Sequence, residues 1–172
     1  MNRYKHRAYN EELMDDLTAG GPSMDQTLRE LETINRWLGG NFVTIDGLVK
    51  LLKKSPSRPL VIADLGCGGG DILKLVARWA SKKKLEVELV GFDANPHIIE
   101  YAKENCKEFK NIRFEVQDIF SEEFKQREFD IILCTLFTHH FTENQLTGIF
   151  KQFKSQAKIG VVINDLHRHP LA

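Results

Sequence analysis

The stretch VIADLGCGGGDIL, residues 61–73, places a bare backbone beside acidic side chains. Its glycines Gly66, Gly68 and Gly70 can adopt positive φ angles, and they lack the Cβ atoms that would hold a ligand away from the main chain. A helical pattern resumes directly after them, so the free N–H groups of a helix start are expected at the same place. This turn is therefore predicted to bind a ligand against main-chain atoms.

The spacing and the charge of the turn argue against a phosphate ligand. A dinucleotide motif G-x-G-x-x-G that starts at Gly66 requires a glycine at position 71, but the sequence has Asp71, and no phosphate-loop lysine follows. The carboxylates of Asp64 and Asp71 would repel a pyrophosphate and attract a ligand that carries an ammonium or sulfonium group. The turn therefore favours a cationic ligand, and a nicotinamide-dependent oxidoreductase stays a weaker alternative.

The elements that must position this turn follow from the hydrophobic pattern. Short apolar runs at 60–66, 86–93, 112–118, 129–135 and 159–165 alternate with helical patterns at 71–80, 96–106 and 143–156. Parallel strands need such long crossovers, so we expect an α/β fold: a Rossmann-like, doubly wound, mostly parallel sheet with helices on both faces. Ligands of such sheets bind beyond the carboxyl ends of the strands, where the glycine turn lies.

Residues 1–57 are expected to form an arm and helices that belong to the same domain. Apolar residues recur at helical spacing from Ser23, which is predicted to cap this helix, to Gly39 and Gly40, which are predicted to end it. A second helix is predicted over 44–54. Trp37 is expected to pack the first helix on the sheet, and the alternative is a helix that closes over the ligand.

The overall composition limits the classes of function. The 172 residues suit one domain, and the 24 basic residues balance the 24 acidic ones, so no nucleic-acid partner is expected. The three cysteines lack a C-x-x-C spacing and are expected to be reduced thiols. No signal peptide or membrane span is recognised in the sequence, which predicts a cytoplasmic protein.

The motif DLGCGGG resembles the first motif, D-x-G-x-G-x-G, of class I S-adenosylmethionine-dependent methyltransferases, and further motifs of that family follow in order. FDIILCTLFTHHF is similar to the fourth strand and following turn of the ubiquinone- and menaquinone-type members. The resemblance covers about residues 60–165. It implies S-adenosylmethionine as cofactor and methyl transfer to an oxygen or carbon of an aromatic, quinone-like, polyketide or lipid-like small molecule. A module that binds the cofactor without catalysis is the alternative.

The resemblance also assigns roles to single residues. Asp93 corresponds to the acid that takes the ribose hydroxyls, although it could instead cap the helix that follows. Asp118 and Ile119 correspond to the pair beside the adenine, although Asp118 could be an ordinary turn residue. The complete predicted cofactor set is Asp64, Gly66, Cys67, Gly68, Gly70, Asp93, Ala94, Asp118, Ile119 and Thr135.

His139 and His140 lie in the turn after the fourth strand, where an acceptor would meet the methyl group. Both are candidate catalytic residues, one as a general base, and a structural histidine is the alternative. Asn164 and Asp165 could contact the acceptor or a metal, or cap the next turn. The pair His167 and His169 lacks a matching carboxylate set, so no metal site is expected.

The predicted core, residues 58–172, departs from the family at its end. The sheet of the family usually continues through a helix and an antiparallel pair of strands, whereas this chain ends at HPLA. We therefore expect a C-terminally incomplete core whose fifth strand is an exposed edge. A homodimer that covers this edge is a further expectation.

Overall fold

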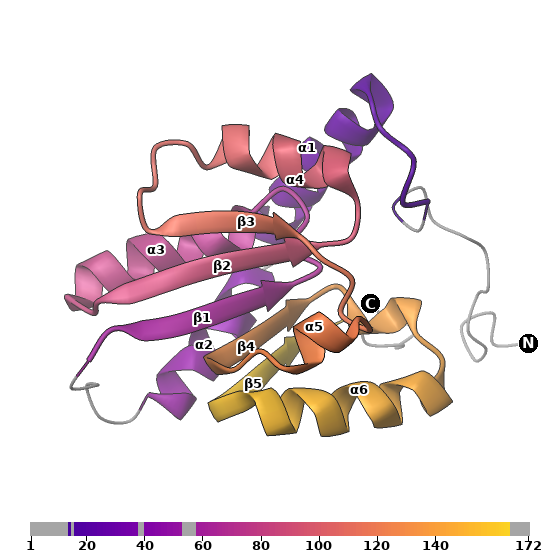
Figure 1. Ribbon diagram of the computed structural model, residues 1–172. Helices are drawn as coiled ribbons and strands as arrows, with labels where there is room; N and C mark the ends of the chain where they lie inside the picture. The colour runs from indigo at the N-terminus through magenta and orange to yellow at the C-terminus, as the bar shows by residue number, and fades with distance from the viewer. Residues whose placement is uncertain (1–13, 15, 38–39, 53–57, 166–172) are drawn as a thin grey trace, which may run out of the picture.

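The computed structural model describes residue 14 and residues 16–37, 40–52 and 58–165 (Figure 1). Five strands form one sheet in the order β3-β2-β1-β4-β5, and every neighbouring pair is parallel. The strands are β1 Leu60–Leu65, β2 Val87–Asp93, β3 Ile112–Val116, β4 Phe129–Thr135 and β5 Ala157–Asn164. The predicted doubly wound α/β fold is confirmed.

Helices cover both faces of the sheet, and each face has its own apolar core (Figure 1). On one face Leu48, Val76 and Ile99 come from α2, α3 and α4, and on the other Phe124 and Phe153 come from α5 and α6. The helices are α1 Pro22–Trp37, α2 Gly40–Leu51, α3 Asp71–Lys83, α4 Pro96–Asn105, α5 Glu122–Lys125 and α6 Glu143–Gln156. No described helix is long and apolar enough to cross a membrane.

The strand order fixes where a ligand can bind. The chain builds β1, β2 and β3 outward in one direction and then returns to the other side of β1 for β4 and β5. The turn after β1 therefore lies at the point where the direction reverses, which is the usual ligand crevice of a doubly wound sheet. All the strand arrowheads in Figure 1 lie at this carboxyl edge.

Two helices precede the sheet as predicted, at Pro22–Trp37 and Gly40–Leu51, but their details differ. Most of the predicted arm, residues 1–13, lies outside the described residues. α1 begins at Pro22, and the amide of Asp25 bonds to Gly21, so Ser23 lies inside the first turn and does not cap the helix. Proline suits this position because its missing N–H group would have had no partner there. Gly40 begins α2 instead of ending α1, and α2 starts four residues before the predicted position 44.

Trp37 does not pack on the sheet, so that expectation is wrong. Its side chain is 79% exposed, whereas Met24 and Leu28 are buried against Ile98 of α4. Trp37 follows Leu28 by about two and a half helical turns, which places it on the opposite side of α1. The apolar face of α1 is therefore set by its first half.

Polar contacts hold α1 beside the glycine turn. Asn35 donates to Asp71 at the start of α3, with 3.2 Å between Nδ2 and Oδ2. The buried Lys74 lies 2.7 Å from Glu32 Oε1 and 3.0 Å from Asn105 Oδ1, and it thereby joins α1, α3 and α4. A change in the packing of α1 is therefore transmitted to the turn that precedes α3.

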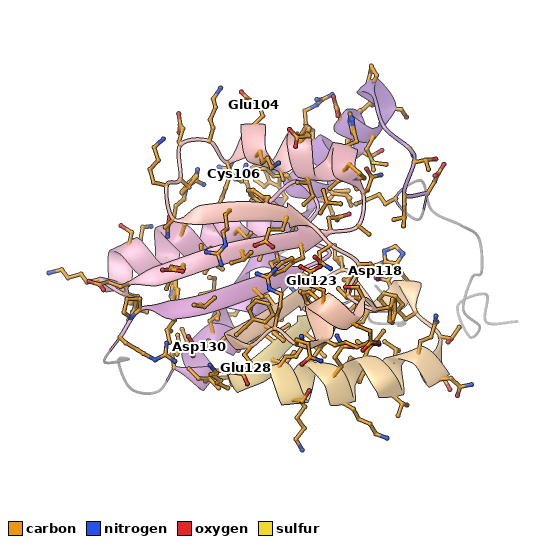
Figure 2. The ribbon with its side chains drawn as sticks, viewed as in Figure 1. Glu104, Cys106, Asp118, Glu123, Glu128 and Asp130 are labelled. Carbon is orange, nitrogen blue, oxygen red and sulfur yellow. The ribbon has the colours of Figure 1, made fainter. Side chains whose placement is uncertain are left out.

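The opposite end of the sheet is held by a separate ion pair. Asp130 is buried there and accepts hydrogen bonds from Arg58 and from the amide of Val61. Arg58 holds the pKa of the Asp130 carboxyl below its ordinary value. Figure 2 shows Asp130 at one end of the sheet and Asp118 at the other, so this pair is remote from the glycine turn.

Candidate active site

The glycines of the turn after β1 are required by its geometry. Gly66, Gly68 and Gly70 have φ angles of +66°, +49° and +77°. A Cβ atom on Gly66 would lie 2.1 Å from Phe137 Cδ2, and one on Gly70 would lie 2.7 Å from Cys106 Sγ. A Cβ on Gly68 would lie 3.8 Å from Leu28 Cδ2, an ordinary van der Waals contact. Gly66 and Gly70 are thus required both for their φ angles and for space, whereas Gly68 is required for its φ angle alone.

Asp64 ends β1 directly beneath this turn, and it is an unusual group to bury. Its side chain is 1% exposed, and Oδ1 has no hydrogen-bond partner among the described residues. Burial, followed by the nearby charges of Asp71 and Asp93, raises the pKa of the Asp64 carboxyl well above its ordinary value. A cationic ligand or a hydrogen-bond donor would compensate this carboxyl. The structure therefore fits the cationic ligand that the sequence predicts.

Asp93 ends β2 beside Asp64 and is half-buried. Burial raises its pKa, while backbone N–H groups of Asn95, Gly68 and Ala94 act against that rise. The alternative role of Asp93 as a helix cap is wrong, because the side chain of Asn95 accepts the first free amides of α4. Asp93 therefore lies where it can serve a ligand on the glycine turn.

The residues expected beside the adenine follow β3 at the same edge (Figure 2). Asp118 is exposed, and its Oδ1 accepts the amide of Phe120 at 2.8 Å, so it also has the turn role left open by the sequence. Ile119 is buried in the core beneath α6, and its carbonyl accepts a hydrogen bond from Gln152. Their contact with a cofactor stays a prediction.

The end of β4 is linked to the front helices by a residue that the sequence analysis missed. Thr44 of α2 is fully buried, and its hydroxyl lies 3.2 Å from Thr135 Oγ1 and 3.1 Å from Asn164 Nδ2. Thr135 was predicted as a cofactor residue, and Asn164 as a candidate acceptor contact. The structure shows that both side chains also hold α2 against the ends of β4 and β5.

The loop after β4 has a strained start and an ordered turn. Leu136 adopts a φ of +51°, and its amide donates to the carbonyl of Asn164 at 2.8 Å. A positive φ is costly for a leucine, so the bond to β5 helps to keep the loop in this conformation. A 3-10 turn, Thr138–His140, follows and carries both candidate histidines.

Asp165 holds this turn from the end of β5. One carboxylate oxygen accepts the hydroxyl of Thr138 and, at 3.0 Å, the amide of His139, and the other lies 2.7 Å from His139 Nδ1. The turn that Asp165 supports is the one after β4, 26 residues earlier in the chain. Asp165 is a candidate from the sequence, but no sequence pattern links it to His139.

The two histidines lie side by side, with their ring centroids 4.1 Å apart. His139 contacts Asp165. Burial raises the pKa of Asp93, and the charge of His140 is one of the smaller effects that act against this rise. The site therefore brings the glycine turn, Asp93 and both histidines to the same edge of the sheet.

A row of aromatic rings, also missed in the sequence, lines the same edge. Phe137 covers Gly66, and its ring centroid lies 5.0 Å from that of Phe141, which lies 5.6 Å from that of Phe120. Both pairs have the edge-to-face geometry that aromatic rings prefer. Because Phe120 directly follows Ile119, the row joins the predicted adenine side to the loop with the histidines.

In the part of the chain that the structure describes, neither the cysteines nor a cluster of metal ligands adds a reactive group to the site. Cys67, Cys106 and Cys134 are free thiols and are buried, and burial raises the pKa of Cys106 to about 12 and those of the other two well above their ordinary values. High thiol pKa values keep cysteines unreactive. Among the described residues no group of potential metal ligands occurs, and His167 and His169 lie outside those residues.

Comparisons with known proteins identify the family. The profile of a family described as "Methyltransferase domain" matches residues 57–167. A carboxy-S-adenosyl-L-methionine synthase of Helicobacter pylori (strain ATCC 700392 / 26695) is 31% identical over 127 residues, which are 73% of this chain and 50% of that protein. This chain thus spans about half the length of the curated relatives that it matches.

Solved structures share the fold. A protein of Methanococcus maripaludis assigned to the S-adenosyl-L-methionine-dependent methyltransferases has 14% identity and a TM-score of 0.58 over 89% of this chain and 64% of its own. The plantazolicin methyltransferase BpumL, in complex with SAH and a pentazolic analog, has 25% identity and a TM-score of 0.54 over 78% of this chain and 48% of its own. The prediction from the ordered motifs is confirmed, and the chain belongs to the methyltransferase domain family.

Proposed function

We propose that this chain binds S-adenosylmethionine at the carboxyl edge of its sheet and transfers the methyl group to an oxygen or carbon of a small-molecule acceptor. The observation that carries the proposal is the buried carboxyl of Asp64, with an unpartnered oxygen among the described residues, beside a turn whose three glycines have positive φ angles. Such a site suits a cationic ligand that lies on main chain, and S-adenosylmethionine has both an ammonium and a sulfonium group.

Different residues at this edge would bind different parts of the cofactor. Asp64 and the glycine turn would hold the amino-acid part, and Asp93 would accept the two ribose hydroxyls. The adenine would lie beside Asp118 and Ile119. The predicted cofactor set is completed by Cys67, Ala94 and Thr135. Family membership, and the binding of SAH by the structural relative BpumL, support this assignment.

Methyl transfer requires the protein mainly to position the acceptor against the methyl group. When bound, the cofactor would supply an electrophilic methyl group to the acceptor oxygen or carbon, and the electron pair of the broken bond would stay on its sulfur atom. The loop after β4 must hold the acceptor in line and exclude water. His139 or His140 takes the proton that the acceptor loses. The row of Phe137, Phe141 and Phe120 suits a flat, apolar acceptor, in agreement with the predicted aromatic or quinone-like class.

The direct test is calorimetry with S-adenosylhomocysteine (SAH), the demethylated product, on the wild type and on Asp93→Asn. We expect micromolar binding that weakens about ten- to a hundredfold in the variant, since a hydrogen bond to a charged group contributes about 1.5–3 kcal/mol. Asp46→Asn, on the exposed surface of α2, is the matched control and should bind as the wild type does. NAD should not bind.

Other outcomes of this experiment distinguish the alternatives. A folded wild type that does not bind SAH contradicts the proposal, and saturable NAD binding instead supports the oxidoreductase alternative. SAH binding without methyl transfer to any acceptor supports the module without catalysis.

The likeness to carboxy-S-adenosyl-L-methionine synthases raises one more candidate, in which the cofactor gains a carboxyl group. Mass spectrometry of the cofactor after turnover separates the two reactions, because methyl transfer leaves SAH.

A further inference from the structure

We propose that Asp165 is a positioning residue that fixes the tautomer of His139 and thereby prepares His139 to act as the general base of this site. The inference rests on the proposed function, in which either histidine is a candidate base. It goes further because it assigns the role to one ring nitrogen, Nε2 of His139, and it explains the cluster at the end of β5.

The tautomer follows from the chemistry of the pair. Nδ1 of His139 lies 2.7 Å from Oδ1 of Asp165, and an ionised carboxylate can only accept a hydrogen bond. Nδ1 must therefore carry the proton, so in the neutral ring the lone pair is on Nε2. The carboxylate also stabilises the positive charge that His139 gains when it takes a proton from the acceptor. These are the properties that a base for a hydroxyl or an acidic C–H group requires.

The contacts of Asp165 also fix the position of the ring. Its second oxygen accepts the Thr138 hydroxyl and the His139 amide, so one side chain holds both the backbone and the imidazole of the turn. The Leu136 amide bonds to Asn164, the residue before Asp165, and this ties the start of the same loop to β5. The contacts of Asp165 thus fix both the tautomer and the position of the His139 ring.

Asp165→Asn tests the tautomer without removing the support of the turn. The amide oxygen can still accept the Thr138 hydroxyl and the His139 amide, while the amide nitrogen takes the place of Oδ1 and donates to His139 Nδ1. His139 must then carry its proton on Nε2, which removes the lone pair that the base needs. A merely structural role for Asp165 predicts the same exchange of tautomers but an unchanged turnover, so turnover is the readout that separates the two roles.

Asp16→Asn is the matched control. Asp16 also accepts a backbone amide and a threonine hydroxyl, both from Thr18, but it has no hydrogen bond to a histidine among the described residues. The readout is the long-range proton–nitrogen spectrum of the imidazole rings, with the His139 signals assigned through His139→Gln. Spectra are recorded with and without SAH, and calorimetry measures the SAH affinity of each variant.

We expect a proton on Nδ1 of His139 in the wild type and in Asp16→Asn, and on Nε2 in Asp165→Asn, with SAH affinity unchanged throughout. With a competent acceptor, Asp165→Asn should lose about 10²–10⁴-fold in turnover. A wild-type His139 with its proton on Nε2 overturns the inference even if the variant fails to fold. So does an Asp165→Asn protein that keeps the wild-type tautomer. Loss of SAH binding by the wild type would contradict the proposed function alone, since the spectra without ligand still determine the tautomer.

Discussion

At the scale of single residues, the site combines groups that would destabilise a protein without a ligand. Asp64 is a buried carboxyl with an unpartnered oxygen, and Asp71 and Asp93 raise its pKa further. Burying an ionisable group without a partner costs free energy unless the group stays neutral. We interpret this free-energy cost as a source of ligand affinity, because a bound ammonium group would remove it.

Asp64→Asn should therefore stabilise the empty protein and abolish its response to SAH. Since the folded pKa of Asp64 is raised, the wild type loses stability as the pH rises from the ordinary value toward the folded one, and the variant does not. The melting temperature of the variant should exceed that of the wild type by about 2–4 °C for each kcal/mol gained. The gap should be wider at about pH 8 than at about pH 5.

Thermal melts of both proteins at the two pH values, with and without SAH, measure this effect. Asp46→Asn controls for the loss of a charge at the surface. A less stable Asp64→Asn protein would mean that the Asp64 carboxyl already has a favourable partner in the fold.

The site residues differ in how far a sequence can predict them. Gly66, Gly68 and Gly70 are recognisable because one short turn imposes their positive φ angles, and Asp93 because one helix and one strand return it to the same edge. The pairing of Asp165 with His139 depends instead on two loops that meet only after β4 and β5 align. The same holds for Thr44, whose partners lie 91 and 120 residues further along the chain.

At the scale of elements, α1 shows the limit of a periodic pattern. The apolar residues at helical spacing predict the helix correctly, but only Met24 and Leu28 are buried, while Ile34 and Trp37 are exposed. Hydrophobic spacing indicates which side chains share a face, but the partner helix determines how much of that face is covered. Here α4 covers the first half through Ile98.

Leu28→Ala should weaken both α1 docking and SAH binding. Leu28 is buried, and its Cδ2 lies 3.8 Å from where a Cβ on Gly68 would be, so its truncation leaves a cavity beside the turn. We expect a loss of about 2–5 kcal/mol in the free energy of unfolding. Ile34→Ala, on the exposed part of the same helix, should change neither property appreciably. Denaturant unfolding and SAH calorimetry measure both, and an Leu28→Ala protein with wild-type SAH affinity would contradict the link between α1 and the turn.

At the scale of the whole molecule, the number of strands and their crossovers could be predicted from the sequence, and the reversal of direction at β1 accounts for the position of the site. The exposure of the two sheet edges could not be predicted from the sequence, because it depends on the order of the strands in the sheet. β3 forms one edge and carries the charged residues Arg113 and Glu115. β5 forms the other and exposes Ile159 and Ile163. Charged side chains are a common protection of edge strands, and β5 largely lacks them.

We therefore predict that the chain associates through β5, by pairing of the edge strands of two copies. Ile163→Lys introduces a charge on this edge and should shift the protein toward monomer, as measured by light scattering over a range of concentrations. Val116→Lys is the matched control, since Val116 is a similarly exposed apolar residue on β3. A wild type that is monomeric at every concentration, or a Val116→Lys protein that dissociates as readily as Ile163→Lys, would contradict the prediction. The contrast is informative because the two described edge strands differ in charge: β3 carries Arg113 and Glu115, whereas β5 carries mainly uncharged side chains.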